Sequence, residues 1–424
     1  MNRHPSPLHQ AVILAVGSEL LTPHKLDTNS LFLTERLNAH GVAVRYKVVV
    51  GDDEDDLVRA IHDAEARADL VVVTGGLGPT DDDLTRTAVA TAFGLDLTED
   101  ADVVSSIRSR FESRGLQMPD INRRQALVPE GALVLPNPRG TAPGLWIERG
   151  DRVCLLLPGP PRELRPMFEQ VLSDRLSART AEYRIFRRVL TIVGRTESHV
   201  EELTQPIYSQ WRAPGPVIDT TILASLGQLE LHLSTRSDDA GRATHVLDDA
   251  TAALADVLGK SLVSTSGESL ETVVGRLLTE QACRVALAES CTGGLTTSRL
   301  TDVPGSSAYV LAGWVAYSND AKVALGVDGG LIEQHGAVSE PVALAMATQA
   351  CLHAGADYGI GITGIAGPGG GTAEKPVGLV SFGLAGSAGP IRTRTFRFPG
   401  ERDRVKFQAS QTALDMLRRE LQRR

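Results

Sequence analysis

The sequence has few cysteines and no long apolar run, and each absence excludes a class of protein. The four cysteines (Cys154, Cys283, Cys291 and Cys351) include no Cys-x-x-Cys pair, which argues against a disulfide framework and against a zinc site. No apolar run approaches the roughly 20 residues that spanning a bilayer requires. The first one, AVILAVGSELL, lacks a small-residue cleavage site and is typical of a buried strand. We therefore expect a cytoplasmic protein without a membrane partner.

Positive charge is also scarce, because the sequence has 43 Lys and Arg but 52 Asp and Glu, which gives a net charge of -9. A broad nucleic-acid surface needs Lys and Arg to neutralise phosphates, so we expect no nucleic-acid partner. Small phosphorylated ligands are not excluded, because a local cluster of arginines can bind a single phosphate. The alternative is that the arginines of such a cluster are solvated surface residues. The cluster consists of Arg392, Arg394, Arg397, Arg402 and Arg404.

At 424 residues the chain is long enough for several domains. Residues 1–175 alternate short apolar runs with helical stretches, which predicts an α/β domain whose mostly parallel sheet is doubly wound. Residues 176–262 change to a small α+β pattern, in which SLVSTSGES is the expected linker at the end. Residues 263–424 return to strands and helices, and they predict a second α/β domain.

A candidate nucleophile lies at the end of an apolar strand in RVALAESCTGGLTTSRL. We expect a helix to begin within one or two residues of Ser290, where unpaired backbone N–H groups favour an oxyanion. Gly293 and Gly294 lack side-chain bulk and let a substrate approach the backbone. The alternative is that Ser290 only caps the helix, as serine commonly does.

A serine nucleophile needs a base, and no histidine with an aspartate partner follows nearby. GWVAYSNDAKVALG places Tyr317 and Lys322 five residues apart, where a strand end leads into a helix. Lysine acts as a base when burial lowers its pKa, although a solvated helix lysine is the usual outcome. YGIGITGIAGPGGG predicts another strand that ends in a glycine-rich turn with Thr363, Gly364 and Gly367.

Together, AESCTGG, YSNDAK, HGAVSEPVA, ITGIAGPGGG and EKPVG resemble the C-terminal domain of the CinA family (competence/damage-inducible protein A), over about residues 265–424. That domain is known as nicotinamide mononucleotide (NMN) deamidase. The resemblance implies hydrolysis of NMN to nicotinate mononucleotide and ammonia through an acyl-enzyme, without a cofactor, in a homodimer. It implies these roles: Ser290 as nucleophile, Lys322 as base, Tyr317 as its neighbour, Thr363 and Gly364 against the substrate, and Arg404 on the phosphate.

In the first domain, LVVVTGGLGPTDDDLTRTAVATAF predicts a buried strand, a glycine-rich turn and a helix that starts near Thr80, with Asp83 as a capping-box acid. Such a turn offers N–H groups to a phosphate, and the acids offer oxygen ligands to a divalent cation. The alternative is that the acids only favour the helix dipole. GKS/T and GxGxxG motifs are both absent here. The candidates are Gly75, Gly76, Gly78 and Thr80 for substrate and Asp81, Asp82 and Asp83 for metal.

Two more strand ends contribute, and in a doubly wound sheet all three meet at one crevice. GSELL and DTNS supply Glu19, a further candidate metal ligand, and Asn29 for substrate. LPGPPREL supplies Gly159 and Arg162 for substrate. These motifs resemble the molybdopterin-binding-like domain at the N-terminus of CinA proteins, over about residues 10–170. Pro23 replaces a glycine that the family often has, which predicts a stiffer first loop.

This second resemblance implies an ADP-ribose pyrophosphatase that depends on a divalent cation (Mg, Mn or Co) and releases AMP and ribose 5-phosphate. The middle module resembles the KH-type insert of full-length CinA proteins. Its VGRTES turn has Gly194 but lacks the second glycine of GxxG, so we expect a linking and dimer-forming role in place of RNA binding.

The leading hypothesis is therefore a bifunctional pyridine-nucleotide salvage hydrolase that acts on NMN and ADP-ribose. A second hypothesis keeps the deamidase but makes the first domain a non-catalytic nucleotide or pterin binder, because fold alone does not fix function. A third, suggested by the family's name, is a DNA-uptake or repair accessory. The acidic net charge opposes direct DNA binding in that case.

Overall fold

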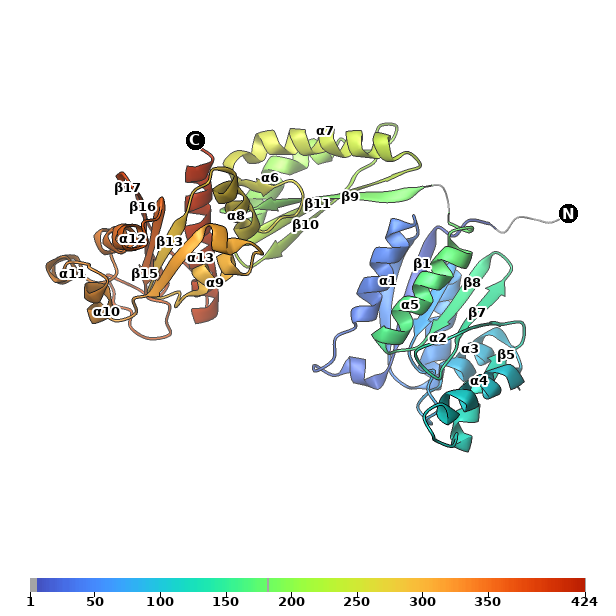
Figure 1. The fold of residues 1–424 in the computed structure, drawn as a ribbon. Helices are drawn as coiled ribbons and strands as arrows, with labels where there is room; N and C mark the ends of the chain where they lie inside the picture. The colour runs from blue at the N-terminus through green and yellow to red at the C-terminus, as the bar shows by residue number, and fades with distance from the viewer. Residues whose placement is uncertain (1–5, 181–182, 424) are drawn as a thin grey trace. The chain divides into compact units, whose positions relative to one another are not determined.

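The computed structural model describes residues 6–180 and 183–423, which form two compact units (Figure 1). One unit extends to Phe186 and includes Thr235–Thr244, and the other consists of Arg187–Ser234 and the chain from His245 onward. Within the described ranges, no helix combines the length and the apolar character needed to cross a membrane.

A six-stranded sheet with the order β2-β1-β3-β8-β7-β6 forms the centre of the first unit. The pairs β1–β2, β1–β3 and β3–β8 are parallel, and β7 pairs antiparallel with β8 and β6. The inner strands are apolar because both faces are covered, as the sequence predicted. The strands are β1 (Gln10–Val16), β2 (Ala43–Val50), β3 (Leu70–Thr74), β6 (Leu133–Leu135), β7 (Gly144–Arg149) and β8 (Arg152–Leu157).

Helices cover both faces of this sheet, which confirms the predicted doubly wound domain. Helices α1 (Thr28–Ala39) and α5 (Pro161–Val171) share one core with it, and α2 (Glu54–Arg67) and α3 (Thr85–Phe93) share the other. Further along the chain, α4 (Ala101–Glu112) packs on a short helix, Asp120–Ala126, next to a small sheet. That sheet pairs β4 (Leu97–Glu99) with β5 (Leu127–Pro129).

The middle of the chain forms a four-stranded sheet with the order β10-β11-β9-β12. SLVSTSGES is only partly the linker that we predicted, because Leu262 and Ser264 pair with Ile192 and Thr191 of β9. The elements are β9 (Arg184–Ile192), α6 (Glu197–Tyr208), β10 (Asp219–Ser225), β11 (Gln228–Ser237), α7 (Ala240–Leu258) and β12 (Leu262–Ser264).

The C-terminal sheet has five strands in the order β14-β13-β15-β16-β17. Its first three strands are parallel, and β16 and β17 form an antiparallel hairpin at one edge. The carboxyl ends of the parallel strands therefore lie at one end of the sheet, which is where the candidate site forms. The strands are β13 (Val285–Glu289), β14 (Val310–Val315), β15 (Tyr358–Gly364), β16 (Leu379–Gly386) and β17 (Gly389–Arg397).

Helices also cover both faces of the C-terminal sheet (Figure 1). On one face α12 (Glu340–Ala354) packs so closely that a Cβ on Gly359 or Gly361 would lie 2.0 Å from a helix carbonyl. The strand therefore needs glycine at both positions. The other elements are α10 (Asn319–Ala324) and α11 (Gly329–His335) beside α12, and α8 (Leu270–Glu280), α9 (Leu295–Thr301) and α13 (Arg402–Leu421) on the opposite face.

Candidate active site

Ser290 follows β13 directly and is held by the neighbouring strand. Its amide donates to the Ile362 carbonyl of β15 at 2.8 Å, and its side chain is buried. The predicted helix start next to Ser290 is wrong, because α9 begins at Leu295 after a turn. In that turn Gly293 and Gly294 have φ of 61° and 90°, where a side chain would be strained. Gly294 is the N-cap residue, so Ser290 is not a helix cap.

The amine of Lys322 lies against the Ser290 hydroxyl, with 3.1 Å between Nζ and Oγ. Nζ also contacts the carbonyls of Ala316 at 3.1 Å, Tyr317 at 3.2 Å and Ser318 at 3.4 Å. Lys322 is only 2% exposed, so the alternative of a solvated helix lysine is wrong. Burial lowers the pKa of this amine. In its neutral form this amine has one lone pair, which can accept the proton of the Ser290 hydroxyl.

Tyr317 contributes its backbone carbonyl to the pair, and its side chain points elsewhere. The carbonyl accepts from the Ser290 hydroxyl at 3.4 Å as well as from Lys322. The Tyr317 ring is 57% exposed, and its hydroxyl accepts from Arg402 Nη2 at 2.8 Å. Arg402 also donates to the Gly367 carbonyl at 2.8 Å. The Arg402 side chain thus joins two segments that the sequence assigned to the site.

An open groove of about 990 Å³ lies beside this arrangement. Arg402 and Lys406 of α13 line it together with Gly367, and a Cβ on Gly293 would lie 3.8 Å from Lys406 Nζ. Arg404, which the sequence placed on a phosphate, is exposed and does not line this groove. The reason is helix geometry: Arg402 and Lys406 of α13 share one face of the helix, and Arg404 lies on a different face. Sequence reasoning named Arg402 only as a member of the arginine cluster and did not single out Lys406.

Thr363 and Gly364 support the site by packing. The buried Thr363 hydroxyl donates to the Ala337 carbonyl at 2.8 Å. A Cβ on Gly364 would lie 2.7 Å from Val380 Cγ2 and 3.0 Å from Cys291 Sγ. Burial raises the pKa of the Cys291 thiol to about 12, so this cysteine does not compete with its neighbour as a nucleophile.

Glu289 is a site residue that sequence reasoning missed. Its side chain is fully buried and accepts from the amides of Thr296 at 3.0 Å and Thr297 at 2.8 Å, and from the Thr297 hydroxyl at 2.7 Å. These bonds fasten the first turn of α9 to the end of β13 and enclose the Ser290 turn. The acid directly before the serine, with two threonines soon after the glycines, was the available signal.

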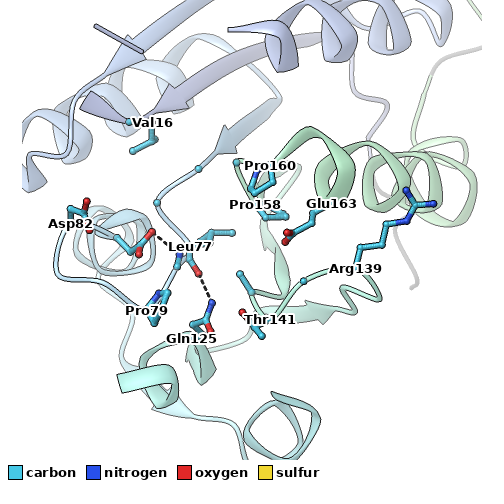
Figure 2. A pocket seen from close by; sticks show the side chains of 18 of the residues that line it. Val16, Leu77, Pro79, Asp82, Gln125, Arg139, Thr141, Pro158, Pro160 and Glu163 are labelled. Carbon is cyan, nitrogen blue, oxygen red and sulfur yellow. Dashed lines mark hydrogen bonds between the residues drawn. The ribbon is translucent and has the colours of Figure 1, made fainter. Parts of the chain in front are cut away.

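A second cleft, of about 500 Å³, lies where the parallel strands of the first unit end. Segments that follow β1, β3 and β8 line it, including Glu19, Gly75, Gly76, Gly78, Gly159 and Arg162. Figure 2 shows Pro79 and Asp82 on the side of the glycine-rich loop, and Pro158, Pro160 and Glu163 on the side of α5. The three predicted strand ends therefore lie at one crevice.

The Asp83 side chain forms hydrogen bonds with other residues of its own glycine-rich loop. Its carboxylate accepts from the amide of Gly78 at 2.6 Å and from the amide of Thr80 at 2.9 Å, as well as from the Thr80 hydroxyl. The predicted helix start near Thr80 is wrong, because α3 begins at Thr85. Asp83 thus holds a compact turn in the place where we expected a first helical turn.

The predicted acids do not form a preformed cation site. Asp81 pairs with Arg124 and is outside the cleft lining, whereas Glu19, Asp82 and Asp83 belong to that lining. Across residues 6–180 and 183–423, no three His, Cys, Asp or Glu side chains are grouped so as to hold a metal ion. Mg²⁺ usually takes only one or two protein carboxylates and completes its shell with water and substrate phosphates, so Glu19 and Asp82 stay the candidate ligands.

The cleft contains arginines opposite these acids. Arg110, Arg114, Arg139 and Arg162 line it, and only Arg162 was predicted. Asn29 lies outside the lining, where its Nδ2 donates to the Gly159 carbonyl at 2.7 Å. This hydrogen bond joins the start of α1 to the loop before α5. Asn29 therefore supports a loop that lines the cleft, without lining the cleft itself.

Comparison with known proteins gives matches over both domains. The family model "CinA C-terminal domain" matches residues 267–421, and "Probable molybdopterin binding domain" matches residues 12–178. Among solved structures, the protein CinA with unknown function from Thermoplasma acidophilum is 35% identical, covers 39% of this chain and 97% of its own, and has a TM-score of 0.37. The competence/damage inducible protein CihA from Agrobacterium tumefaciens is 40% identical, with coverage of 38% and 99% and a TM-score of 0.35.

Full-length relatives are also similar. The CinA-like protein of Koribacter versatilis is 46% identical over 97% of this chain and 99% of the relative. The CinA-like protein of Solibacter usitatus is 42% identical over 97% and 98%, respectively. The chain therefore belongs to the CinA family, with a molybdopterin-binding-like domain followed by a CinA C-terminal domain.

Proposed function

We propose that the C-terminal domain hydrolyses the amide of NMN, with Ser290 as nucleophile and Lys322 as base. The observation that carries this proposal is the 3.1 Å contact between Ser290 Oγ and the buried Lys322 Nζ. Burial lowers the pKa of the amine, which increases the fraction of Lys322 able to accept the serine proton.

In the first half of the reaction, Ser290 Oγ attacks the amide carbon while its proton passes to Lys322 Nζ. Lys322 then protonates the departing nitrogen, so that ammonia leaves and an acyl-serine remains. In the second half, Lys322 accepts a proton from water, the hydroxide attacks the acyl carbon, and the proton returns to Ser290. Nicotinate mononucleotide is then released as the carboxylate.

The surroundings of the pair support this chemistry. Among the described residues, the Gly294 amide donates to no protein acceptor, which makes it a candidate donor to the oxyanion. Arg402 and Lys406 line the adjacent groove, where their charges suit the phosphate of a mononucleotide. A substrate with an amide at one end and a phosphate at the other matches these two features.

The test is ammonia release from NMN by the full chain, with a chelator present throughout. Ser290→Ala and Lys322→Ala should each lower kcat/KM by about 10³-fold or more, because nucleophile and base act as one unit. Ser306→Ala and Lys47→Ala are matched controls, because they change the same residue types outside the site, and both should keep the wild-type rate. A Ser290→Ala variant that still releases ammonia at the wild-type rate would refute the proposal.

A second candidate function belongs to the first unit, where we propose binding and hydrolysis of ADP-ribose. The favouring observation is the 500 Å³ cleft, in which a glycine-rich loop faces four arginines. Loop amides and guanidinium groups are the usual partners of a pyrophosphate. Glu19 and Asp82 would hold a divalent cation beside this pyrophosphate, where it would polarise the phosphoryl oxygens.

AMP release from ADP-ribose tests this second function, with Mg²⁺, Mn²⁺, Co²⁺ or chelator added in separate arms. The double variant Arg139→Gln/Arg162→Gln should weaken ADP-ribose binding by about tenfold or more, whereas Arg108→Gln, outside the cleft lining, should not. Binding without AMP release in every arm would favour the non-catalytic nucleotide-binding domain.

A further inference from the structure

A third groove, in the second unit, contains positive charge and aromatic rings that the proposed reactions do not use. Its volume is about 1020 Å³, and it shares no lining residue with the groove beside Ser290. Its walls come from the turn between β9 and α6, the hairpin turn between β10 and β11, the residues just before β12, and the facing surfaces of β17 and α13. All of the lining residues lie within one compact unit.

Two arginines on β17 line this groove, and the described residues offer neither of them a partner of opposite charge. Arg392 and Arg394 alternate with Thr393, so they share one face of the strand. Thr393 belongs to the other face, where its hydroxyl donates to Glu340. In the part of the chain that the structure describes, neither arginine forms an ion pair or a side-chain hydrogen bond. Their guanidinium groups are therefore available to an anion.

The rest of the lining adds to this positive charge. Arg195, Lys260 and Arg419 bring the lining cations to five, against the two carboxylates of Glu197 and Asp415. Asp415 is already occupied, because it accepts from Arg419 at 2.7 Å and also pairs with Arg418. In a chain with a net charge of -9, this groove has the opposite sign from the protein as a whole.

An aromatic surface continues the arginine face of β17. Phe396 follows Arg394 by two residues, and its side chain is 43% exposed in the groove lining. The Phe396 and Phe398 ring centroids are 6.1 Å apart, and the buried Phe382 meets both rings edge-on. The exposed ring is thus fixed from behind, and its free surface can stack against a planar base.

We propose that this groove binds a small nucleotide, with its phosphate on Arg392 and Arg394 and its base on Phe396. Phosphate and base are the two chemical groups that unpaired guanidinium groups and a supported aromatic ring recognise. The groove is large enough for a mononucleotide or a dinucleotide. Single-stranded nucleic acid is less suitable, because an acidic protein attracts few polyphosphates.

Calorimetric titration of the full chain with AMP, in the presence of chelator, tests the proposal. Arg392→Gln/Arg394→Gln should weaken one AMP binding event by at least about tenfold, because two charge-assisted contacts are lost. The matched control Arg276→Gln, which changes an arginine already paired with Glu268 and Glu280, should not weaken it. The cleft variant Arg139→Gln/Arg162→Gln identifies any AMP bound in the first unit. Unchanged AMP binding in the Arg392→Gln/Arg394→Gln protein overturns the proposal.

Ribose 5-phosphate, which lacks the base, tests the stacking surface. Phe396→Ala should reduce the affinity for AMP by about tenfold and leave that for ribose 5-phosphate unchanged. Equal effects on both ligands, or an oligonucleotide that binds much more tightly than AMP, would overturn the nucleotide assignment. Photolabelling of the wild-type chain with 8-azido-AMP does not depend on the folding of a variant. It should mark the peptide that contains Phe396, and labelling confined to the first unit would contradict the proposal.

Discussion

The chemistry of Lys322 depends on where its amine is buried. Nζ meets three carbonyl oxygens and one hydroxyl but, among residues 6–180 and 183–423, no carboxylate that would stabilise its charge. Removal from water disfavours the charged form and lowers the pKa of the amine, as expected of a lysine without an acidic partner. The same burial therefore positions the base and keeps more of it neutral.

The pH dependence of NMN deamidation should follow this titration. A charged amine cannot accept the serine proton, so kcat/KM should rise with pH and level off once Lys322 is neutral. Because burial lowers the pKa, the midpoint should lie below the ordinary value for lysine. Initial rates across the pH range in which the chain stays folded measure it, and Lys322→Arg, which stays protonated, should be inactive throughout. A midpoint at or above the ordinary value would contradict this account.

At Tyr317, the role of the backbone carbonyl can be tested separately from the role of the side chain. Its carbonyl contacts Lys322, whereas its hydroxyl accepts from Arg402. Tyr317→Phe keeps the carbonyl, so kcat should change little while KM for NMN rises about tenfold through the loosened Arg402. Tyr208→Phe, which removes a hydroxyl bonded to Glu201, is the matched control. If kcat falls by orders of magnitude with KM unchanged, the tyrosine hydroxyl takes part in the chemistry.

Glu289 connects a strand to the helix that follows the nucleophile. Its carboxylate accepts three hydrogen bonds from the start of α9, and the turn with Ser290 lies between the two elements. Glu289→Gln replaces one acceptor oxygen with an NH₂ group that opposes these donors. We expect a loss of about 1–3 kcal/mol in the free energy of unfolding.

The Glu289→Gln variant should also lose about tenfold in kcat, because the Ser290 turn is no longer held in place. Urea unfolding and ammonia release measure the two effects. Glu280→Gln, on an exposed ion pair with Arg276, is the control and should change neither quantity appreciably. Wild-type kcat in a destabilised Glu289→Gln protein would show that Glu289 has only a structural role.

Strands and strand ends could be predicted from sequence because apolar runs and glycine-rich turns are local patterns. Ser290 follows the end of β13, and Lys322 lies in the helix that comes after the neighbouring strand β14, so a parallel sheet brings the two segments to the same end. The starts of α3 and α9 were misplaced, because Asp83 and Gly294 build turns before each helix. Whether the Arg402 side chain of α13 faces the groove depends on how the helix packs, and no local sequence pattern predicts that packing.

The same limit applies to the acids of the first unit. Three consecutive aspartates favour a cation site by composition, but the backbone directs their side chains differently. Asp81 pairs with Arg124, Asp83 lines the cleft but hydrogen-bonds to its own loop, and Asp82 also lines the cleft. The sequence therefore shows which residues are acidic, whereas only the fold shows which of their side chains lie close together.

Within the second unit, a single buried arginine joins the middle sheet to the C-terminal helix. Arg418 of α13 is fully buried, pairs with Asp415, and donates to the carbonyls of Lys260 at 2.7 Å and Leu262 at 3.2 Å. Those carbonyls lie at the start of β12, so the guanidinium group satisfies backbone acceptors on one element from another. Burying it without these partners would be unfavourable.

Arg418→Ala should therefore lower the free energy of unfolding by about 3–5 kcal/mol, because it leaves two carbonyls without their donor and removes one of the two arginines that pair with Asp415. Arg423→Ala, which removes an exposed pair with Glu420 on the same helix, should change it by less than about 1 kcal/mol. Chemical unfolding of both variants, followed by circular dichroism, gives the comparison. Equal stability losses would mean that the buried contacts do not hold these elements together. A large loss only in Arg418→Ala, with the first unit unfolding as in the wild type, would place this connection within the second unit alone.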